Sequence, residues 1–208
     1  LSGLVGSEMC IRDSPHSSLT NAIQNLLQLE NINSPEILFH LKKRYIENLI
    51  YTYAGKILIS INPFQPTSLY SSPTQSLFLS NLHNNISSFS NPHLYELAND
   101  SILSHLKNFS FLISGESGSG KTESTKKLLD YFSLHYKDTK NILPTILEFN
   151  SILEAFGNAS TSRNHNSSRF GKFITININQ SQEISAKIRT YLLEKIRVVS
   201  DNLSNYHI

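Results

Sequence analysis

The sequence predicts an α/β fold, and three observations support this prediction. Patterns typical of strands, loops and helices alternate along the 208 residues, as they do in α/β domains. A glycine-rich turn at residues 115–122 separates a short apolar run from a helical pattern. Two alternating segments nearer the C-terminal end are separated by a polar turn, which is typical of an antiparallel hairpin. The length favours one domain with a sizeable core.

Composition and charge exclude several classes of protein. Charged residues make up 16% of the chain, hydrophobic residues 39%, and the net charge is +2. So small a positive excess does not favour a nucleic-acid partner or a polybasic membrane contact. The single cysteine, Cys10, excludes an internal disulfide framework and a cysteine-rich zinc site. No apolar run reaches the ~18 residues of a membrane span, so we expect a soluble protein of a reducing compartment.

The N-terminal residues carry no folding signal. The chain begins at Leu1 without an initiator methionine, so we expect it to be a fragment. Residues 1–14 lack the basic and apolar regions of a secretory signal and resemble translated adapter sequence. A natural disordered N-terminus is the alternative. We expect residues 1–17 to be a leader outside the fold and residues 18–208 to form the domain.

The first segments predict a helix followed by a strand. Residues 36–50 place their apolar side chains on one helical stripe, after a Ser-Pro pair typical of a helix start. The basic residues 42–44 are expected on the solvated face of this helix. Residues 56–61 alternate as a strand does, and the strand is expected to end at the turn signal Asn62-Pro63.

The middle of the chain predicts a long loop, a helix and a buried strand. Residues 63–92 hold four prolines among many Ser and Asn residues. We therefore expect a loop there, with at most one short helix at 75–81. A second helix is expected at 93–107. The apolar run at 108–114 predicts a buried strand that leads into the glycine-rich turn.

The last part of the chain predicts two helices and a hairpin. Helices are expected at 121–136 and 141–156, where apolar residues recur at helical spacing. Residues 173–179 and 184–193 each alternate as strands do, with a polar turn between them. We expect this pair to form the antiparallel hairpin.

The strongest functional signal is a glycine-rich run that fits the pattern G-x-x-x-x-G-K-S/T, namely Gly115-Glu116-Ser117-Gly118-Ser119-Gly120-Lys121-Thr122. Its three glycines let the backbone turn tightly, so that several N–H groups converge on one point. With the start of the following helix, these groups form a nest for phosphate oxygens. Lys121 would reach the β- and γ-phosphates, and Thr122 would offer its hydroxyl to Mg²⁺. The alternative is a glycine-rich turn without phosphate.

A nucleotide site with Mg²⁺ also needs a second element near the γ-phosphate. The candidate is the polar run Ser162-Arg163-Asn164-His165-Asn166-Ser167-Ser168-Arg169-Phe170. Its Asn and Ser side chains can donate to phosphate oxygens, and a Ser hydroxyl can complete an octahedral Mg²⁺ shell. An ordinary Asn-Ser loop is the alternative in a chain this rich in both residues.

With these two runs, the sequence resembles the myosin motor head from about residue 18 to residue 208. Residues 113–126 are similar to the family's phosphate loop, with Ser119 in place of the usual Ala and Ser124 in place of Asn. Residues 163–173 resemble its switch I. Further matches occur in the expected order at residues 41–53, 61–64, 150–159 and 191–199.

The resemblance implies a role for each matched residue. Gly115 to Thr122 would cradle the triphosphate, with Lys121 neutralising its charge. Thr122 and Ser168 would be the protein ligands of Mg²⁺. Asn164 and Ser167 would contact the phosphates, Ser167 near the attacking water, and Arg169 would pair with a Glu of switch II. The implied catalytic set is Lys121, Asn164, Ser167 and Arg169.

The adenine side of the implied site matches the family less well. Asn62, Pro63 and Tyr70 correspond to the family's adenine-side segment. The basic residues usual between them are replaced by Gln65 and Pro66. Adenine binding by these three residues is an expectation from the resemblance, and packing of Tyr70 in a loop is its alternative.

The resemblance also implies a fold and a function. The fold would be a P-loop NTPase-like mixed sheet flanked by helices, of which this chain holds an incomplete, N-terminal portion. The function would be that of an actin-based motor driven by Mg-ATP hydrolysis, located in the cytoplasm with the cytoskeleton. Actin filaments are the implied partner, and light chains or calmodulin are left open. Since no switch II or actin-binding region occurs in the sequence, we expect the isolated chain to hydrolyse ATP very poorly.

Three other functions stay open. A kinesin-like motor also joins a phosphate loop to an Asn…Ser-Ser-Arg switch, but residues 170–173 and 153–158 favour a myosin. A P-loop kinase would not explain the switch I run. A myosin-like scaffold that binds nucleotide without hydrolysing it is kept open by the departures at Gln65, Pro66 and Ile196, the last standing where Ser is usual.

Overall fold

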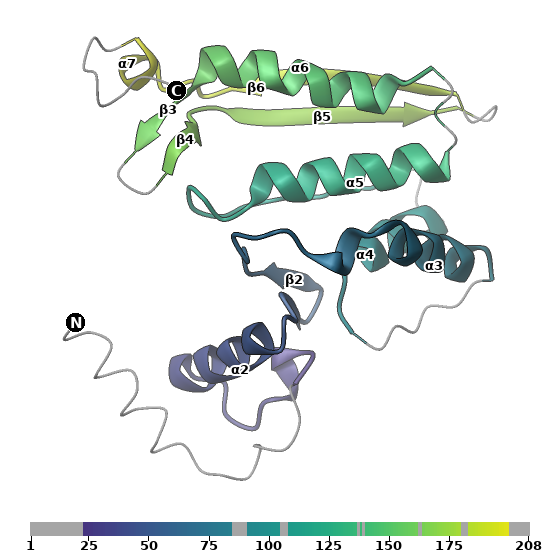
Figure 1. Cartoon of the computed structure of the whole chain (residues 1–208), viewed down its shortest axis with the longest axis vertical. Coiled ribbons are helices and arrows are strands. Elements are labelled where there is room, and N and C mark those ends of the chain that lie inside the picture. Colours follow the sequence, from purple (N-terminus) through teal and green to yellow (C-terminus); the bar gives the residue numbers. More distant parts are fainter. Residues whose placement is uncertain are drawn as a thin grey trace. The chain divides into compact units, whose positions relative to one another are not determined.

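Figure 1 presents the computed structural model of the chain, which describes residues 23–84, 91–104, 108–136, 138, 140–161, 164–179 and 183–199. The expected leader at residues 1–17 lies outside this part. The chain divides into two compact units, Leu1–Leu103 and Ser104–Ile208. Helices and strands occur in both, which confirms the α/β class. The described strands form three separate two-stranded antiparallel sheets, and no mixed sheet forms among them.

The first unit contains three α-helices, two 3₁₀-helices and one strand pair in its described residues. Helix α2 begins at Ser34, slightly before the expected start, because Asn33 is the N-cap: its side chain accepts a hydrogen bond from the Glu36 N–H at 2.9 Å, and Pro35 lies in the first turn. The elements are η2 (Leu26–Gln28), α2 (Ser34–Ile46), β1 (Tyr51–Ala54), β2 (Ile57–Ser60), η3 (Ser68–Tyr70), α3 (Ser72–His83) and α4 (Leu94–Leu103).

Three expectations for this unit need correction. The helix expected to reach residue 50 ends at Ile46, because Asn48 takes a left-handed conformation with φ of 61°. The strand expected at 56–61 is β2, but its antiparallel partner β1 was not expected. Helix α3 spans Ser72–His83 and is longer than the short helix expected at 75–81. Helix α4 confirms the start of the helix expected at 93–107 but ends at Leu103, and residues 105–107 lie outside the described part.

The expected solvated face at residues 42–44 is wrong for Arg44. Its side chain is only 1% exposed, and its guanidinium donates to the Tyr51 carbonyl from Nε at 3.1 Å and from Nη2 at 2.8 Å. Arg44 therefore joins α2 to the first residue of β1. A charged side chain in a helical pattern does not reveal this, because the acceptor lies in the following strand.

A cluster of aromatic rings forms the core of this unit around His93. His93 is 4% exposed and packs against Tyr51, Tyr70 and Phe78. Its Nδ1 accepts from the Tyr95 N–H at 3.0 Å, so Nε2 carries the proton and donates to the Leu69 carbonyl at 3.0 Å. Both ring nitrogens are therefore satisfied only in the neutral imidazole.

Acid is expected to destabilise this unit through His93. Burial lowers the pKa of His93 from 6.5 to about 4. Because the pKa is lower in the folded state, the neutral ring stabilises the fold fully above pH 6.5, and this contribution is lost as the pH falls toward 4. We expect the free energy of unfolding to fall across this window and the slope to flatten in His93→Gln. His83→Gln, which changes an exposed histidine of α3, is the control. An unchanged slope in His93→Gln would contradict the prediction.

The second unit contains two long helices, a short one and two strand pairs in its described residues. Helices α5 and α6 match the helices expected at 121–136 and 141–156, and β5 and β6 confirm the expected hairpin, paired from Gly171↔Tyr191 to Ile178↔Ile184. The elements are α5 (Lys121–His135), α6 (Ile142–Gly157), β3 (Asn158–Thr161), β4 (Asn164–Ser168), β5 (Gly171–Ile178), β6 (Ile184–Tyr191) and α7 (Lys195–Val198).

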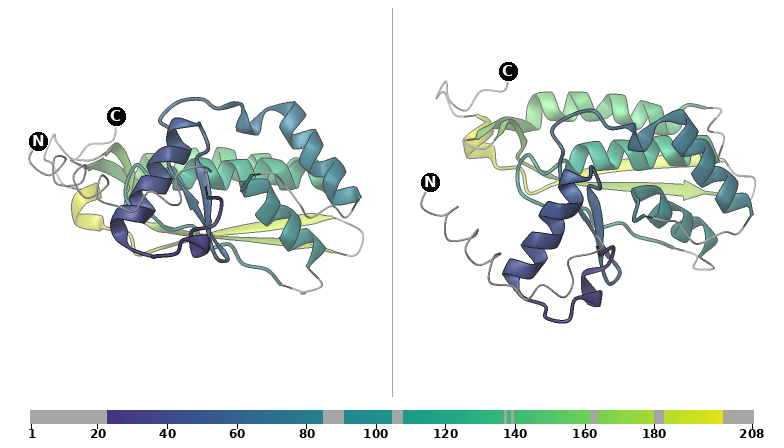
Figure 2. Two further views of the ribbon diagram at one scale, coloured as in Figure 1. Left: turned by 90° about the horizontal axis from the view of Figure 1, so that it is seen from below. Right: turned by 60° about the horizontal axis from the view of Figure 1, so that its bottom comes forward.

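The core of this unit lies between the two long helices and the hairpin, as Figures 1 and 2 show. Buried Leu129 of α5 and Leu143 and Ile146 of α6 meet Ile184 of β6. Alternate residues of β5, including Ile174 and Ile176, pack against the same cluster. The glycine-rich turn leads into α5, and the strand pair β3–β4 follows α6.

One expectation for this unit was wrong. The apolar run at 108–114 has no regular secondary structure and forms no strand with the described residues, and Leu112 is 94% exposed. An apolar run becomes a buried strand only where a neighbouring strand supplies hydrogen bonds. The polar run at 162–170, for which an ordinary loop was the alternative, contains β4, which pairs with β3 at Asn158↔Ser168 and Ala159↔Ser167.

Candidate functional site

The glycine-rich turn has the backbone geometry of an anion nest. Gly118 and Gly120 have φ of 81° and 91°, where residues with a Cβ are strained. Ser119 N–H donates to the Glu116 carbonyl at 3.2 Å, which closes the turn. Gly120 then begins α5 without a side-chain cap. The N-terminal N–H groups of α5 therefore remain available to a phosphate.

The side chain of Lys121 folds back over this turn. Its Nζ donates to the Gly115 carbonyl at 2.7 Å and to the Glu116 carbonyl at 2.8 Å. An ammonium group has three donors, so one remains for a phosphate oxygen. The exposed ammonium thus lies at the mouth of the nest, as the phosphate role of Lys121 requires.

Strand β4 contacts the glycine-rich turn through two serines. Ser117 Oγ donates to Ser167 Oγ at 2.8 Å, and Ser167 is only 3% exposed. Arg169 Nη1 donates to the same oxygen at 3.2 Å. Residues 50 positions apart in the sequence are thereby brought together. Since Ser167 accepts both hydrogen bonds, its own hydroxyl hydrogen is left to donate elsewhere.

The next serine is arranged to offer its oxygen. Ser168 Oγ donates to Asn158 Oδ1 at 3.1 Å, and Asn158 Nδ2 donates to Asn166 Oδ1 at 2.8 Å. Ser168 uses its proton in this bond, so its lone pairs remain available to a cation. Mg²⁺ prefers such neutral and anionic oxygens, and Thr122 offers a second hydroxyl in the first turn of α5. The donor set therefore fits Mg²⁺.

Asn158 was not among the expected site residues. It is 5% exposed and holds Ser168 through the β3–β4 pairing. Asn158 lies within residues 150–159, which resemble the family, so the sequence drew attention to this segment. The pairing that aligns Asn158 with Ser168 is visible only in the structure.

Arg169 is paired with Glu194, a second residue that was not expected. Arg169 Nε donates to Glu194 Oε2 at 2.6 Å, and Nη2 forms an ion pair with the same oxygen. The backbone adds a bond from Glu194 N–H to the Arg169 carbonyl at 2.9 Å. The predicted hairpin already indicated that these two residues could meet. Its register pairs Gly171 with Tyr191, so the residues just before β5 and just after β6 lie at the same end of the hairpin.

The remaining expected site residues are Asn164 and the three adenine-side residues. Asn62, Pro63 and Tyr70 belong to the first unit, and their adenine role stays a prediction. The Tyr70 hydroxyl is hydrogen-bonded to the Tyr51 hydroxyl and its ring packs against Tyr95, which favours the packing alternative. Asn164 is the first residue of β4, and the placement of its side chain lies outside what the structure describes.

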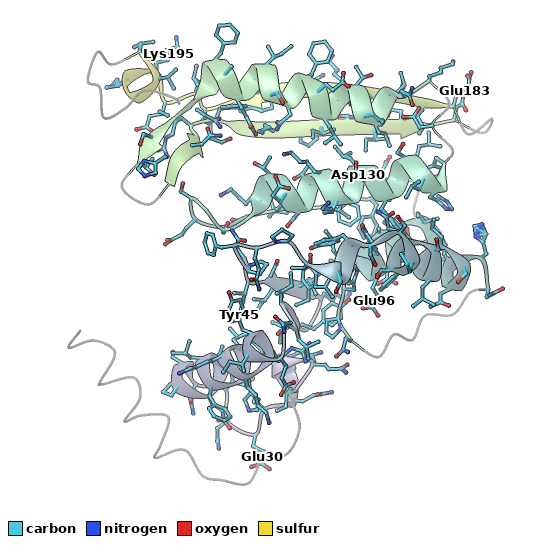
Figure 3. All side chains as sticks on the ribbon, viewed as in Figure 1. Glu30, Tyr45, Glu96, Asp130, Glu183 and Lys195 are labelled. Atoms are coloured by element: carbon cyan, nitrogen blue, oxygen red, sulfur yellow. The ribbon has the colours of Figure 1, made fainter. Side chains whose placement is uncertain are left out.

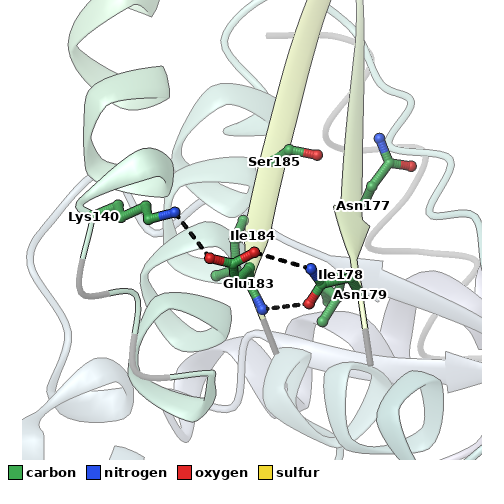
Figure 4. Close-up of a pocket in the computed structure, with 7 residues that line it drawn as sticks. All are labelled: Lys140, Asn177, Ile178, Asn179, Glu183, Ile184 and Ser185. Carbon is green, nitrogen blue, oxygen red and sulfur yellow. Dashed lines mark hydrogen bonds and ion pairs between the residues drawn. The ribbon is translucent and has the colours of Figure 1, made fainter. Parts of the chain in front are cut away.

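A surface cavity of about 310 Å³ lies elsewhere in the second unit, at the turn end of the β5–β6 hairpin (Figure 4). Lys140 Nζ lies 3.1 Å from Glu183 Oε1, and Asn179 Nδ2 donates to Glu183 Oε2 at 3.1 Å. These hydrogen bonds lower the pKa of Glu183. The polar groups satisfy one another, and the cavity contains none of the expected phosphate-site residues. Its lining is Lys140, Asn177, Ile178, Asn179, Glu183, Ile184 and Ser185.

The described residues contain neither a cluster of metal ligands nor a membrane-spanning helix. No group of three or more His, Cys, Asp or Glu side chains in this part of the chain could hold a metal ion. None of the helices that the structure describes has the length and apolar character to cross a membrane. The glycine-rich turn and β4 are therefore the candidate site.

Comparison with known proteins identifies the family. The family model of the myosin head (motor domain) matches residues 23–208. Myosin-1 of Saccharomyces cerevisiae is 42% identical over 92% of this chain, and myosin-VIIa of Drosophila melanogaster is 42% identical over 93%. Unconventional myosin heavy chain 6 of Caenorhabditis elegans is 41% identical over 93%. The chain spans 11%, 9% and 9% of the lengths of these relatives. This chain belongs to the myosin head family.

Proposed function

We propose that this chain is the nucleotide-binding part of an actin-based myosin motor, and that it binds Mg-ATP between the glycine-rich turn and β4. We call these elements the P-loop (residues 115–122) and switch I (residues 163–173). The observation that carries the proposal is the hydrogen bond between Ser117 and Ser167 at 2.8 Å. It brings a buried hydroxyl of switch I to the loop whose N–H groups and Lys121 ammonium suit a polyphosphate.

Each residue of the site has a chemical role in this proposal. The P-loop N–H groups and the third donor of Lys121 bind phosphate oxygens. Thr122 and Ser168 hold Mg²⁺ through their hydroxyl oxygens, and the bound ion would neutralise charge on the β- and γ-phosphates. Ser167 donates its free hydrogen toward the terminal phosphate. Asn164 adds a further donor from the start of β4.

Hydrolysis and movement along actin are proposed for the longer protein. The myosin relatives are far longer than the region that this chain matches, and phosphoryl transfer depends on groups positioned around the attacking water. We propose actin filaments as partner, light chains or calmodulin as further candidates, and a cytoskeletal location. A P-loop NTPase arrangement of the whole sheet belongs to the same proposal.

Calorimetry on the 208-residue chain tests nucleotide binding. We expect saturable heats with Mg-ADP and with a nonhydrolysable Mg-ATP analogue at millimolar concentration or below, weakened when EDTA removes Mg²⁺. Circular dichroism verifies that the sample is folded. Absence of heat from folded protein with both nucleotides would refute the proposal. Actin-stimulated turnover of the full-length protein separates a motor from a scaffold that binds without hydrolysis.

A further inference from the structure

Glu194 begins a chain of hydrogen bonds that ends in the P-loop. Its carboxylate accepts from Arg169 Nε at 2.6 Å, Arg169 Nη1 donates to Ser167 Oγ at 3.2 Å, and Ser117 Oγ donates to Ser167 Oγ at 2.8 Å. The side chains of Arg169 and Glu194 are 25% and 39% exposed, whereas Ser167 is buried. A carboxylate at the rim is thus connected to a hydroxyl inside the proposed phosphate site.

The backbone fixes Glu194 independently of its charge. The hairpin register pairs Gly171 with Tyr191, and Glu194 N–H donates to the Arg169 carbonyl at 2.9 Å. The Arg169 N–H in turn donates to the Gly157 carbonyl at 3.0 Å at the end of α6. The Glu194 backbone is therefore tied to Arg169, which follows β4, and through it to the end of α6.

The planar shape of the Arg169 guanidinium explains how Glu194 influences Ser167. Arginine presents its donors in a rigid planar fork. With Nε and Nη2 directed at Glu194, Nη1 is the end that faces Ser167. The Ser167 oxygen then accepts from Arg169 and Ser117 together, so its hydrogen points away from both. The two hydrogen bonds that Ser167 Oγ accepts also polarise its O–H group and make that group a better donor.

We propose that Glu194 is a positioning residue that gives the site its preference for a triphosphate over a diphosphate. It orients Arg169, and Arg169 orients Ser167, so that the Ser167 hydroxyl is aimed at the terminal phosphate. The inference rests on the proposed function, because it requires nucleotide at the P-loop. In this inference Glu194 acts on the phosphate site through Arg169.

The test compares Kd values of the 208-residue chain for Mg-ADP and a nonhydrolysable Mg-ATP analogue. In Glu194→Gln we expect the preference for the triphosphate to fall about tenfold, the scale of one charge-assisted hydrogen bond, with the Kd for Mg-ADP changed less than about twofold. Glu183→Gln is the matched control, because it removes a carboxylate paired with Lys140 at the other end of the same unit (Figure 3). It should leave both Kd values unchanged.

Two further variants separate positioning from general destabilisation. In an Arg169→Ala background, Glu194→Gln should have no added effect, because the residue through which it acts is gone. Glu194→Asp keeps the charge on a shorter side chain and should lower the preference by about threefold; it decides the question if the Gln variant does not fold.

The outcomes distinguish the inference from the proposed function. If the unaltered chain binds neither nucleotide, the proposed function fails. If it binds both and the preference is unchanged in the folded Glu194 variants, only the inference is overturned. The inference is also overturned if these variants weaken the binding of both nucleotides equally, since a merely structural role of Glu194 predicts that result.

Discussion

Lys121→Ala should weaken binding of the Mg-ATP analogue about a hundredfold and leave the fold in place. A hydrogen bond to a charged group contributes roughly 1.5–3 kcal/mol, and 1.4 kcal/mol corresponds to a tenfold change in Kd. The Lys121 ammonium lies over the P-loop, where its two carbonyl contacts at 2.7 and 2.8 Å hold it ready for a phosphate. These contacts are exposed, so their loss should change the unfolding midpoint little. Calorimetry and thermal unfolding measure the two effects.

Lys126→Ala is the matched control for this prediction. Lys126 lies further along the same helix, and its ammonium is 2.9 Å from the exposed Glu123 carboxylate. The Lys126→Ala variant removes one positive charge, as Lys121→Ala does, together with a surface ion pair that contributes little to stability. Equal losses of affinity in Lys121→Ala and Lys126→Ala would mean that net charge alone attracts the nucleotide, and the assigned role of Lys121 would then be wrong.

Gly157→Ala should lower the free energy of unfolding by about 2–3 kcal/mol, the upper range for overpacking a filled site. Gly157 is buried at the end of α6, and an added Cβ would lie 2.5 Å from Phe170 Cδ1 and closer still to Cε1. The ring has little room to retreat, because the Lys172 ammonium sits 5.3 Å from its centroid and is held by Glu154 at 3.1 Å. Urea unfolding monitored by circular dichroism gives the value.

The same substitution should also weaken nucleotide binding, because the Gly157 carbonyl accepts from the Arg169 N–H at 3.0 Å. Displacing Phe170 moves the neighbouring Arg169 and Ser168. Gly171→Ala is the control, since its Cβ would meet only the Tyr191 carbonyl at an ordinary 3.7 Å. Equal unfolding free energies for Gly157→Ala and Gly171→Ala would show that Phe170 repacks freely and would contradict the prediction.

The elements that the sequence predicted well carry their own periodic pattern. Helices α5 and α6 and the β5–β6 hairpin each bury apolar side chains in the core around Leu143. Local periodicity is sufficient for such segments because their partner surface lies in the neighbouring element. The strand expected at 108–114 failed for the opposite reason. Its apolar residues need a strand from elsewhere, and none of the described residues supplies it.

The strands β3 and β4 could not be predicted from their residues. The run from Asn164 to Ser168 is polar and has no apolar alternation. It is a strand because Asn158 and Ala159 pair with Ser168 and Ser167. Backbone hydrogen bonds and side-chain amides, not burial of an apolar face, hold this pair together.

The sequence by itself determined the P-loop and its chemistry. Glycines at positions that require positive φ, followed by Lys121 and Thr122, specify an anion nest through local backbone geometry alone. Only the tertiary structure decided which side chains meet it. Ser117 reaches Ser167 across 50 positions, and Arg169 reaches Glu194 across 25. Such contacts depend on strand register and on how α6 leads into β3, and these are set by packing of the whole unit rather than by any short segment.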